Sequence, residues 1–389
     1  MIISKTSVQS YYDVGIFSAA MSFSNIFFAI AVFGARNFQV SDINHEYSDV
    51  QYHTLRIMTC IGAAIICVVS AFILGYRHDI LFAIIVFMIY RVFDAYSDLF
   101  YGYSQVNGHL EYAGYSMFIK GIMICVLFAL LLILTQNLII AMFSLILSTA
   151  SLNIFYDQRK AYNHSGLKKM SMKQLIAEFP GIKSLFWACL PLMLNSLIMP
   201  LLLAVPRLLI EKIYSAELLG IFTSVTAPTV IISTFVSAAA LPLIPSTTKA
   251  WQSGKRGKIL AYVILPIFLI VCCCIIGIPF ILRFGGDILR ILYTSAISGY
   301  VDLLVIAIIT SCILACVILC SNMLISMRKI KAMLSFRLIA CIGVFFISGL
   351  FIKKWGIYGA AYAIGFAYTF EFILQILFIG YNVFYIKKH

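Results

Sequence analysis

The sequence predicts an all-α integral membrane protein built from two related helical lobes. Of its 389 residues, 62% are hydrophobic and only 11% are charged, a balance that water-soluble domains do not have. Apolar runs long enough to cross a hydrocarbon core of about 30 Å recur along the whole chain. A short motif is also repeated, as Gly15-Ile-Phe-Ser18 and Gly220-Ile-Phe-Thr223, and the segments that follow the two copies are similar in length and hydropathy. Duplicated bundles of this kind are typical of transporters, whose halves move against each other.

Eleven apolar stretches are candidates for membrane-spanning helices. Each approaches or exceeds the roughly 20 residues that a crossing needs, and together they leave almost nothing for a water-soluble domain. The predicted spans are 14–35, 55–76, 80–103, 113–135, 138–157, 185–209, 218–243, 259–282, 300–325, 332–352 and 357–380. All nine prolines lie between Pro180 and Pro279, so we expect bent helices in the second half of the chain.

The order of the spans suggests how the lobes are divided. We expect an N-terminal lobe of five spans over residues 1–157, a basic cytoplasmic linker over 158–184 and a C-terminal lobe of six spans over 185–389. A complete span precedes Gly220, whereas only fourteen residues precede Gly15. We therefore expect that the first helix of an ancestral twelve-helix bundle is missing. Within the linker, Met170–Phe179 mixes apolar residues with lysine, as either an interfacial helix or a solvated basic loop would.

The net charge of +13 is distributed as a membrane orientation signal, which argues against a nucleic-acid partner. With the amino terminus outside and the carboxyl terminus inside, seven Lys and Arg residues fall on the outer side. Seventeen fall on the inner loops and span ends, including Arg36 and Arg56. We therefore expect an outward amino terminus and a cytoplasmic carboxyl terminus.

Ionisable residues inside the spans are costly unless they face protein or water. Arg91, Asp94 and Asp98 share one face of the third span, because they are spaced by three and four residues. The same span is the most polar in the chain, with Tyr90, Tyr96, Tyr101, Tyr103 and Gln105. Two readings remain open: a neutralised cluster that only holds helices together, and a water-filled path whose tyrosines suit sugars.

Four further charged residues lie within spans: Lys120, Arg207, Arg337 and Glu371. Three of the four are cationic, and unpaired cations in a cavity would attract an anion such as a diphosphate. The three cations could instead extend along their helices to the membrane surface. The acidic residue lies in the middle of the last span, where we expect it to face a pore or to pair with a cation.

Patterns of catalytic and metal-binding residues are absent from the sequence. All eleven cysteines fall within predicted spans, where they are best explained as small packing residues, and the six histidines lie in loops or at the end. No nucleotide-binding glycine motif and no serine-hydrolase motif occurs. We therefore expect no enzymatic activity, no cofactor and no metal site.

Several stretches carry a resemblance to a known family. They are Gly15-Ile-Phe, then Arg36-Asn-Phe-Gln-Val-Ser-Asp42, and later Val205-Pro-Arg-Leu-Leu-Ile210 before Leu219-Gly-Ile-Phe222. These stretches resemble the polysaccharide-biosynthesis, or O-antigen, flippases of the multidrug/oligosaccharidyl-lipid/polysaccharide (MOP) exporter superfamily, and the likeness covers nearly the whole chain. It implies two six-helix lobes that move lipid-diphosphate-linked sugar repeat units across the bacterial inner membrane for O-antigen (lipopolysaccharide) or capsule assembly. With its first helix missing, the first lobe of this chain would have five.

The resemblance and the residues together suggest one set of site residues. We expect the diphosphate to be bound or guided by Arg36, Arg91, Lys120, Arg207 and Arg337. We expect charge balance, or binding of a coupling ion, from Asp94, Asp98 and Glu371. The partners would be a polyprenyl-diphosphate-linked oligosaccharide, membrane lipids and other polysaccharide assembly proteins.

Two other functions remain open at this level. A drug or cation antiporter of the same superfamily would favour acidic over basic residues in its cavity. A membrane glycan polymerase, glycosyltransferase or acyltransferase would present a large outer loop, or a cluster of acids or histidines at one face.

Overall fold

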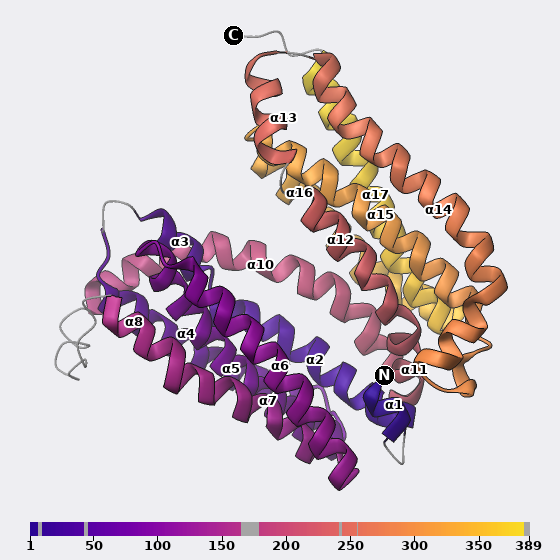
Figure 1. Ribbon diagram of the computed structural model, residues 1–389, viewed down its shortest axis with the longest axis horizontal. Coiled ribbons are helices and arrows are strands. Elements are labelled where there is room, and N and C mark those ends of the chain that lie inside the picture. Colours follow the sequence, from indigo (N-terminus) through magenta and orange to yellow (C-terminus); the bar gives the residue numbers. More distant parts are fainter. Residues whose placement is uncertain (7–9, 43–45, 165–178, 241–242, 255, 385–389) are drawn as a thin grey trace. The chain divides into compact units, whose positions relative to one another are not determined.

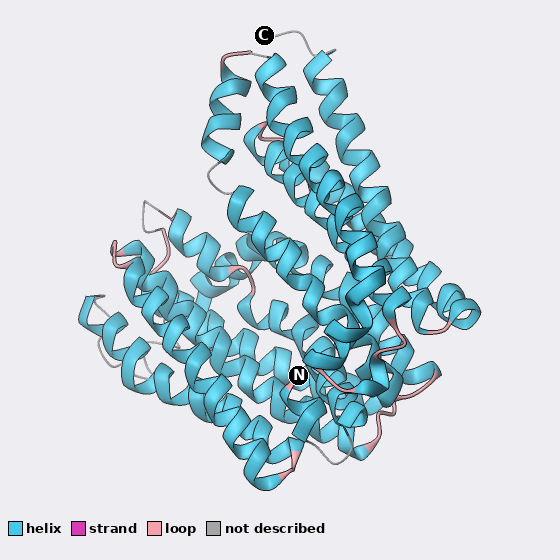
Figure 2. Cartoon of the chain, turned by 45° about the vertical axis from the view of Figure 1, so that its right-hand side comes forward, coloured by secondary structure: helices cyan, strands magenta, loops and turns pink. Residues whose placement is uncertain are grey.

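The structure, a computed structural model, describes residues 1–6, 10–42, 46–164, 179–240, 243–254 and 256–384. Every regular element in these ranges is helical, and they contain no strand (Figure 2). Within the same ranges, eleven helical segments are long and apolar enough to cross a membrane. The all-α fold predicted from the sequence, with about eleven membrane helices, is confirmed.

The first nine elements lie before residue 165 (Figure 1). They are α1 (Ile2–Thr6), α2 (Ser10–Val32), α3 (Ala35–Ser41), α4 (Asp49–Ile73), α5 (His78–Val106), α6 (Leu110–Thr135), α7 (Leu138–Leu152), the π-helix η1 (Asn153–Asp157) and α8 (Gln158–His164). The linker predicted over 158–184 is helical at both of its described ends. The stretch considered as an interfacial helix, 170–179, lies outside the described residues except for its last residue.

The remaining elements follow from residue 179 onward (Figure 1). They are α10 (Phe179–Ile213), α11 (Ala216–Thr226), the 3-10 turn η2 (Ala227–Thr229), α12 (Val230–Ala240), α13 (Leu243–Gln252), α14 (Arg256–Leu292), the 3-10 turn η3 (Ser295–Ile297), α15 (Val301–Ser326), α16 (Ile330–Trp355) and α17 (Ile357–Phe384). Helices α10 and α14 extend well beyond the spans predicted for them. The helix α10 runs without interruption through Pro191, Pro200 and Pro206, whereas the next span is broken at η2, which contains Pro228.

The chain divides into two compact units whose boundary lies within α10. We call Thr6–Ala204 the N-terminal unit and Val205–His389 the C-terminal unit. Most of α1 belongs to the C-terminal unit, where Lys5 Nζ donates a hydrogen bond to the carbonyl of Ile291 at 2.6 Å. In that unit α17 packs against both α15 and α16, and α14 packs along α15 (Figure 1).

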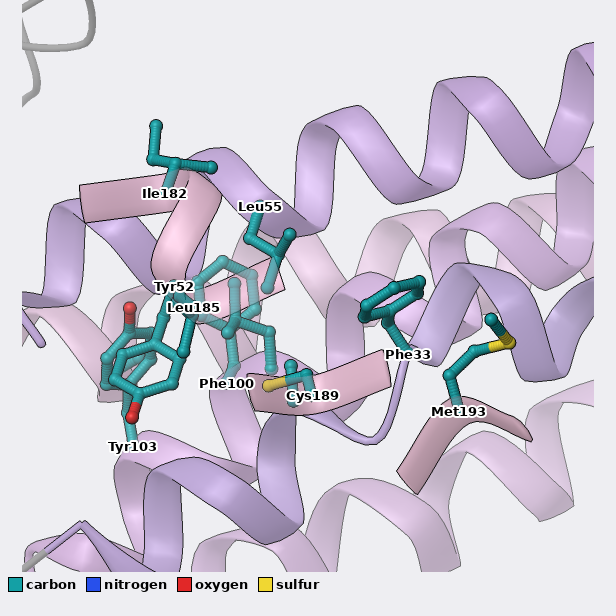
Figure 3. Packing of buried hydrophobic residues seen from close by; sticks show 12 residues of the cluster. Phe33, Tyr52, Leu55, Phe100, Tyr103, Ile182, Leu185, Cys189 and Met193 are labelled. Atoms are coloured by element: carbon teal, nitrogen blue, oxygen red, sulfur yellow. The ribbon is translucent and has the colours of Figure 1, made fainter. Parts of the chain in front are cut away.

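The core of the N-terminal unit is formed by apolar side chains of α4, α5 and the first part of α10, together with the segment that joins α2 to α3. Figure 3 shows the rings of Tyr52, Phe100 and Tyr103 close to Leu185, with Phe33 farther along the cluster. In a membrane such packing replaces contacts with lipid tails, so the stabilisation comes from close fit more than from exclusion of water. Small residues at helix contacts therefore stabilise this unit, because they let the helices approach each other closely.

A sharp break after α2 determines where α3 lies. Both Phe33 and Gly34 have left-handed backbone conformations, with φ of 53° and 65°. A side chain at Gly34 would also bring its Cβ to 2.6 Å from the Cβ of Leu192 in α10. Glycine is thus required here both for its φ and for the close approach of α10. The break turns the chain so that α3 packs against α5.

A second glycine, Gly102 of α5, faces side chains of α3. A Cβ atom at this position would collide with Oε1 of Gln39 and would lie 3.3 Å from Cγ of Arg36. Both of these residues are on α3. The missing side chain therefore allows α3 to bring Arg36 against the polar face of α5.

We predict that Gly34→Ala destabilises the protein by about 1–3 kcal/mol, because alanine is strained at a φ of 65° and its Cβ would lie 2.6 Å from the Cβ of Leu192. Thermal unfolding of the purified protein in detergent measures this effect. The matched control is Gly114→Ala on α6, where the built Cβ meets nothing within 4 Å. The control should be neutral or slightly stabilising. Equal melting temperatures for the two variants would contradict the close approach of α10 to the break after α2.

Candidate functional site

Five polar residues lie along one face of α5 and form the centre of the candidate site. They are Arg91, Asp94, Asp98, Tyr101 and Gln105, and we call them the α5 stripe. Their spacings of three, four, three and four residues follow the helical repeat, so the stripe extends over about 21 Å of the helix. The face predicted for the first three residues thus continues for two more turns.

One carboxylate of the stripe, Asp94, is shared by two cations. Its Oδ2 accepts a hydrogen bond from Arg91 Nη1 at 2.9 Å, and its Oδ1 accepts one from Lys120 Nζ of α6 at 2.7 Å. The side chains of Arg91, Asp94 and Lys120 remain 18%, 17% and 11% exposed. Lys120 is therefore directed to a carboxylate and not along its helix to the membrane surface.

Aromatic rings hold Arg91 in this position. Its Cζ lies 4.7 Å from the ring centre of Phe28, 5.1 Å from that of Tyr90 and 5.5 Å from that of Phe87. A guanidinium group at these distances is attracted by the electron-rich ring faces. Its Nε is buried and has no hydrogen-bond partner in the described part of the chain. The charge is thus positioned by the rings as well as by Asp94.

The second carboxylate of the stripe, Asp98, is also shared by two cations. Its Oδ1 accepts from Arg36 Nη1 of α3, and its Oδ2 accepts from Arg56 Nη2 of α4, both at 3.2 Å. Arg36 also donates from Nη2 to Gln105 Oε1 at 3.0 Å. The side chains of Arg36 and Asp98 are 21% and 22% exposed, so this group is also only partly buried.

The residue Arg56 has a structural role that its place in the sequence did not show. It was counted among the cations of the inner loops and span ends, but its side chain is completely buried. Its Nη1 donates to the carbonyl of Ala31 at 2.9 Å, and the hydroxyl of Thr59 donates to the same oxygen at 2.9 Å. That carbonyl lies in the last turn of α2 and needs other donors because the helix ends there. The position of Arg56, second in the predicted span 55–76, was the signal that could have revealed its burial.

The ring of Tyr101 lies near one cation of each of the two groups. Its centre is 5.4 Å from Lys120 Nζ and 5.8 Å from Arg36 Cζ. Its hydroxyl is hydrogen-bonded to the hydroxyl of Ser116 at 2.9 Å. The two groups therefore form one polar network in which four cations, Arg36, Arg56, Arg91 and Lys120, share the carboxylates of Asp94 and Asp98.

The π-helix η1 adds a third carboxylate, which the sequence analysis did not identify. Asp157 is only 4% exposed and interacts electrostatically with Lys120. Its neighbour Asn153 donates from Nδ2 to Ser97 Oγ of α5 at 3.3 Å. π-helical turns often occur at functional sites. Even with Asp157 counted as ionised, the cations of the network outnumber its carboxylates. The sequence signal that could have identified Asp157 was its position at the end of the predicted span 138–157.

The C-terminal unit contains a separate ion pair. Arg337 Nε donates to Glu371 Oε1 at 3.1 Å, and Arg337 Nη2 donates to Ser321 Oγ at 3.3 Å. Gln375 Nε2 donates to the same Glu371 oxygen at 2.9 Å. Glu371 and Gln375 are completely buried. The sequence analysis expected Glu371 to face a pore or a cation, and the structure pairs it with a cation.

The last of the predicted cations, Arg207 of α10, makes no ion pair within the described residues. It lies near Tyr368 of α17 in the C-terminal unit. Its buried Nε and the buried hydroxyl of Tyr368 both lack hydrogen-bond partners in the described ranges. The structure thus brings Arg36, Arg91, Lys120, Asp94 and Asp98 together in one unit and pairs Arg337 with Glu371 in the other. Over the described residues, no group of three or more His, Cys, Asp or Glu side chains could hold a metal ion.

The eleven long apolar helices define a multi-pass membrane protein. The chain belongs to the polysaccharide biosynthesis protein family, which it matches over residues 6–251. A curated relative, the capsular polysaccharide biosynthesis protein CapF of Staphylococcus aureus, is 25% identical over 361 residues, which cover 90% of this chain and 87% of that protein.

Solved structures show the same fold. The lipid II flippase MurJ in an inward closed conformation superposes with a TM-score of 0.71 at 12% identity, covering 97% of this chain and 84% of that one. An inward-facing multidrug resistance transporter of the MATE family, from the MOP superfamily, gives a TM-score of 0.70 at 15% identity, covering 97% and 95%. The family resemblance inferred from the sequence is confirmed.

We predict that Arg56→Met destabilises the protein by about 2–3 kcal/mol, because it removes a buried donor to both Asp98 and the Ala31 carbonyl. The matched control is Arg36→Met, which removes the other, partly exposed cation of Asp98 and should cost about 1 kcal/mol or less. Thermal unfolding in detergent and the level of protein in the membrane report the difference. A larger loss for the Arg36 variant would contradict the structural role given to Arg56.

Proposed function

We propose that this chain is a flippase that moves a polyprenyl-diphosphate-linked oligosaccharide across the bacterial inner membrane for O-antigen or capsule assembly. The observation that carries the proposal is the excess of cations over carboxylates in the network around the α5 stripe. Membership of the polysaccharide biosynthesis family and the likeness to a capsule biosynthesis protein support it.

The chemistry of such a substrate suits the network. A diphosphate that links a lipid to a glycan is anionic, and cations in a site shielded from water attract anions far more strongly than cations in water do. Arginine also offers paired donors to phosphate oxygens. Tyr101 and Gln105 add polar groups of the kind that hydrogen-bond to sugar hydroxyls. The prenyl tail remains in the lipid during the movement.

The residues of the two units take different roles in this proposal. Arg36, Arg91 and Lys120 bind the diphosphate, while Arg207 and Arg337 guide it. Asp94, Asp98 and Glu371 balance these charges or bind a coupling ion. The substrate enters from the cytoplasm and leaves on the outer side as two lobes alternate in access.

The proposal also covers location and partners. The distribution of Lys and Arg favours an outward amino terminus and a cytoplasmic carboxyl terminus in the inner membrane. Membrane lipids and other polysaccharide assembly proteins are the partners, and the protein transports its substrate without chemical change. A drug or cation antiporter would need an excess of acidic residues, whereas cations predominate among the membrane-embedded charges of the described helices.

We predict that Arg91→Ala and Arg207→Ala abolish surface polysaccharide in a strain that depends on this chain, while the protein remains in the membrane near its normal level. Arg91→Lys should retain part of the activity, because lysine keeps the charge but not the planar pair of donors. Immunoblots of the membranes and staining of surface polysaccharide measure the two quantities.

The matched control is Arg77→Ala, which removes a 72% exposed arginine just before α5 and should leave export unchanged. If Arg91 only neutralises Asp94, its removal leaves a partly buried carboxylate with fewer partners, and the protein should be lost from the membrane. Normal export in both alanine variants would contradict the proposed anion binding.

A further inference from the structure

The two carboxylates of the α5 stripe differ in the burial of the cations that hold them: Arg91 and Lys120 are partly exposed, whereas Arg56 is completely buried. We infer that Asp94 occupies the position of a substrate phosphate group and gives up its two cations to the diphosphate, whereas Asp98 stays in place as a fixed part of the fold. This inference rests on the proposed function and assigns separate roles to the two residues.

The geometry around Asp94 is that of a bound anion. Each of its oxygens contacts a different cation, at 2.7 Å from Lys120 Nζ and 2.9 Å from Arg91 Nη1. A phosphate group bound between the same nitrogens would make the same charge-assisted contacts. Because all three side chains are partly exposed, an incoming anion can reach these nitrogens without unfolding the helices.

The two cations are held in position by other groups as well. Arg91 lies over three aromatic rings, and Lys120 lies over the ring of Tyr101 and interacts with Asp157. When Asp94 leaves, both nitrogens therefore remain where they are. A binding position that is organised in advance loses little free energy in ordering when the ligand enters.

The cations around Asp98 differ from those around Asp94 in their burial. One of its two cations, Arg56, is completely buried and is also bound to the Ala31 carbonyl at the end of α2. An incoming anion cannot reach this buried guanidinium to replace Asp98, and a buried charge that loses its partner is costly. Asp98 therefore cannot be exchanged for a substrate anion as Asp94 can.

The exchange has a consequence for transport. With Asp94 present, a diphosphate must compete with an internal carboxylate, so its affinity is lower than the two cations alone would give. After the substrate has crossed, the returning carboxylate displaces the diphosphate and favours release. Asp94 thus weakens binding but speeds turnover.

The test measures ligand binding by calorimetry on the full chain in lipid nanodiscs. The probes are inorganic pyrophosphate and farnesyl diphosphate, a short prenyl diphosphate. Asp94→Asn should bind both roughly tenfold more tightly, because the local net charge rises by one unit. The gain should shrink at high salt. A gain for pyrophosphate alone would assign the position to a free anion and overturn its link to a lipid-linked substrate.

Three further variants separate charge from structure. Asp94→Glu keeps the carboxylate and should bind like the wild type, and Asp79→Asn, which changes the hydrogen-bond partner of Tyr12 at the other end of α5, should also have no effect. Asp98→Asn should lower the melting temperature instead of raising the affinity. Equal or weaker binding by Asp94→Asn, a gain in Asp94→Glu, or loss of folded Asp94→Asn protein would each overturn the inference.

The result for the wild type tells the two proposals apart. If the wild type binds neither probe, the proposed function fails and the role of Asp94 fails with it. If the wild type binds both probes and Asp94→Asn shows no gain, only the role of Asp94 is overturned.

Discussion

Two aspartates one helical turn apart on α5 each hold two cations, and the rest of the site depends on this sharing. Isolated charges inside a membrane protein are costly, so each must find partners within the protein or water. Asp94 and Asp98 neutralise enough charge for α3, α4 and α6 to place cations against α5. They do not neutralise all of it, and the remaining positive charge is the basis for recognition of an anion.

The fold provides this arrangement through a break in one helix and a close contact between two others. The end of α2 at Val32 frees a carbonyl that Arg56 and Thr59 bind, which fixes Arg56 beside Asp98. The same break begins α3, from which Arg36 reaches Asp98, and Gly102 leaves room for the side chains of Gln39 and Arg36 against α5. A local backbone feature at the end of α2 thus helps to determine the geometry of the charged network on α5.

The sequence was sufficient to predict the helices and the polar face of α5, because hydropathy and helical spacing are local properties of the chain. It could not identify the partners of the charged residues, which are set by contacts between helices. Lys120 could have reached the membrane surface, and only its packing opposite Asp94 decides otherwise. From the sequence, Arg56 was interpreted as a cation at the end of a span. Its partner, the Ala31 carbonyl, becomes available only because α2 ends there, and Gly34 is the one strong sequence signal for that break.

The central claim is that the network recognises the diphosphate of a lipid-linked glycan. Its most direct test is the movement of labelled lipids across liposomes that contain the purified chain. One lipid carries an oligosaccharide through a polyprenyl diphosphate, and the other carries the same oligosaccharide on the same prenyl chain through a neutral linkage. The account predicts that the protein accelerates the movement of the diphosphate lipid only. Equal acceleration of both lipids, or of neither, would contradict it.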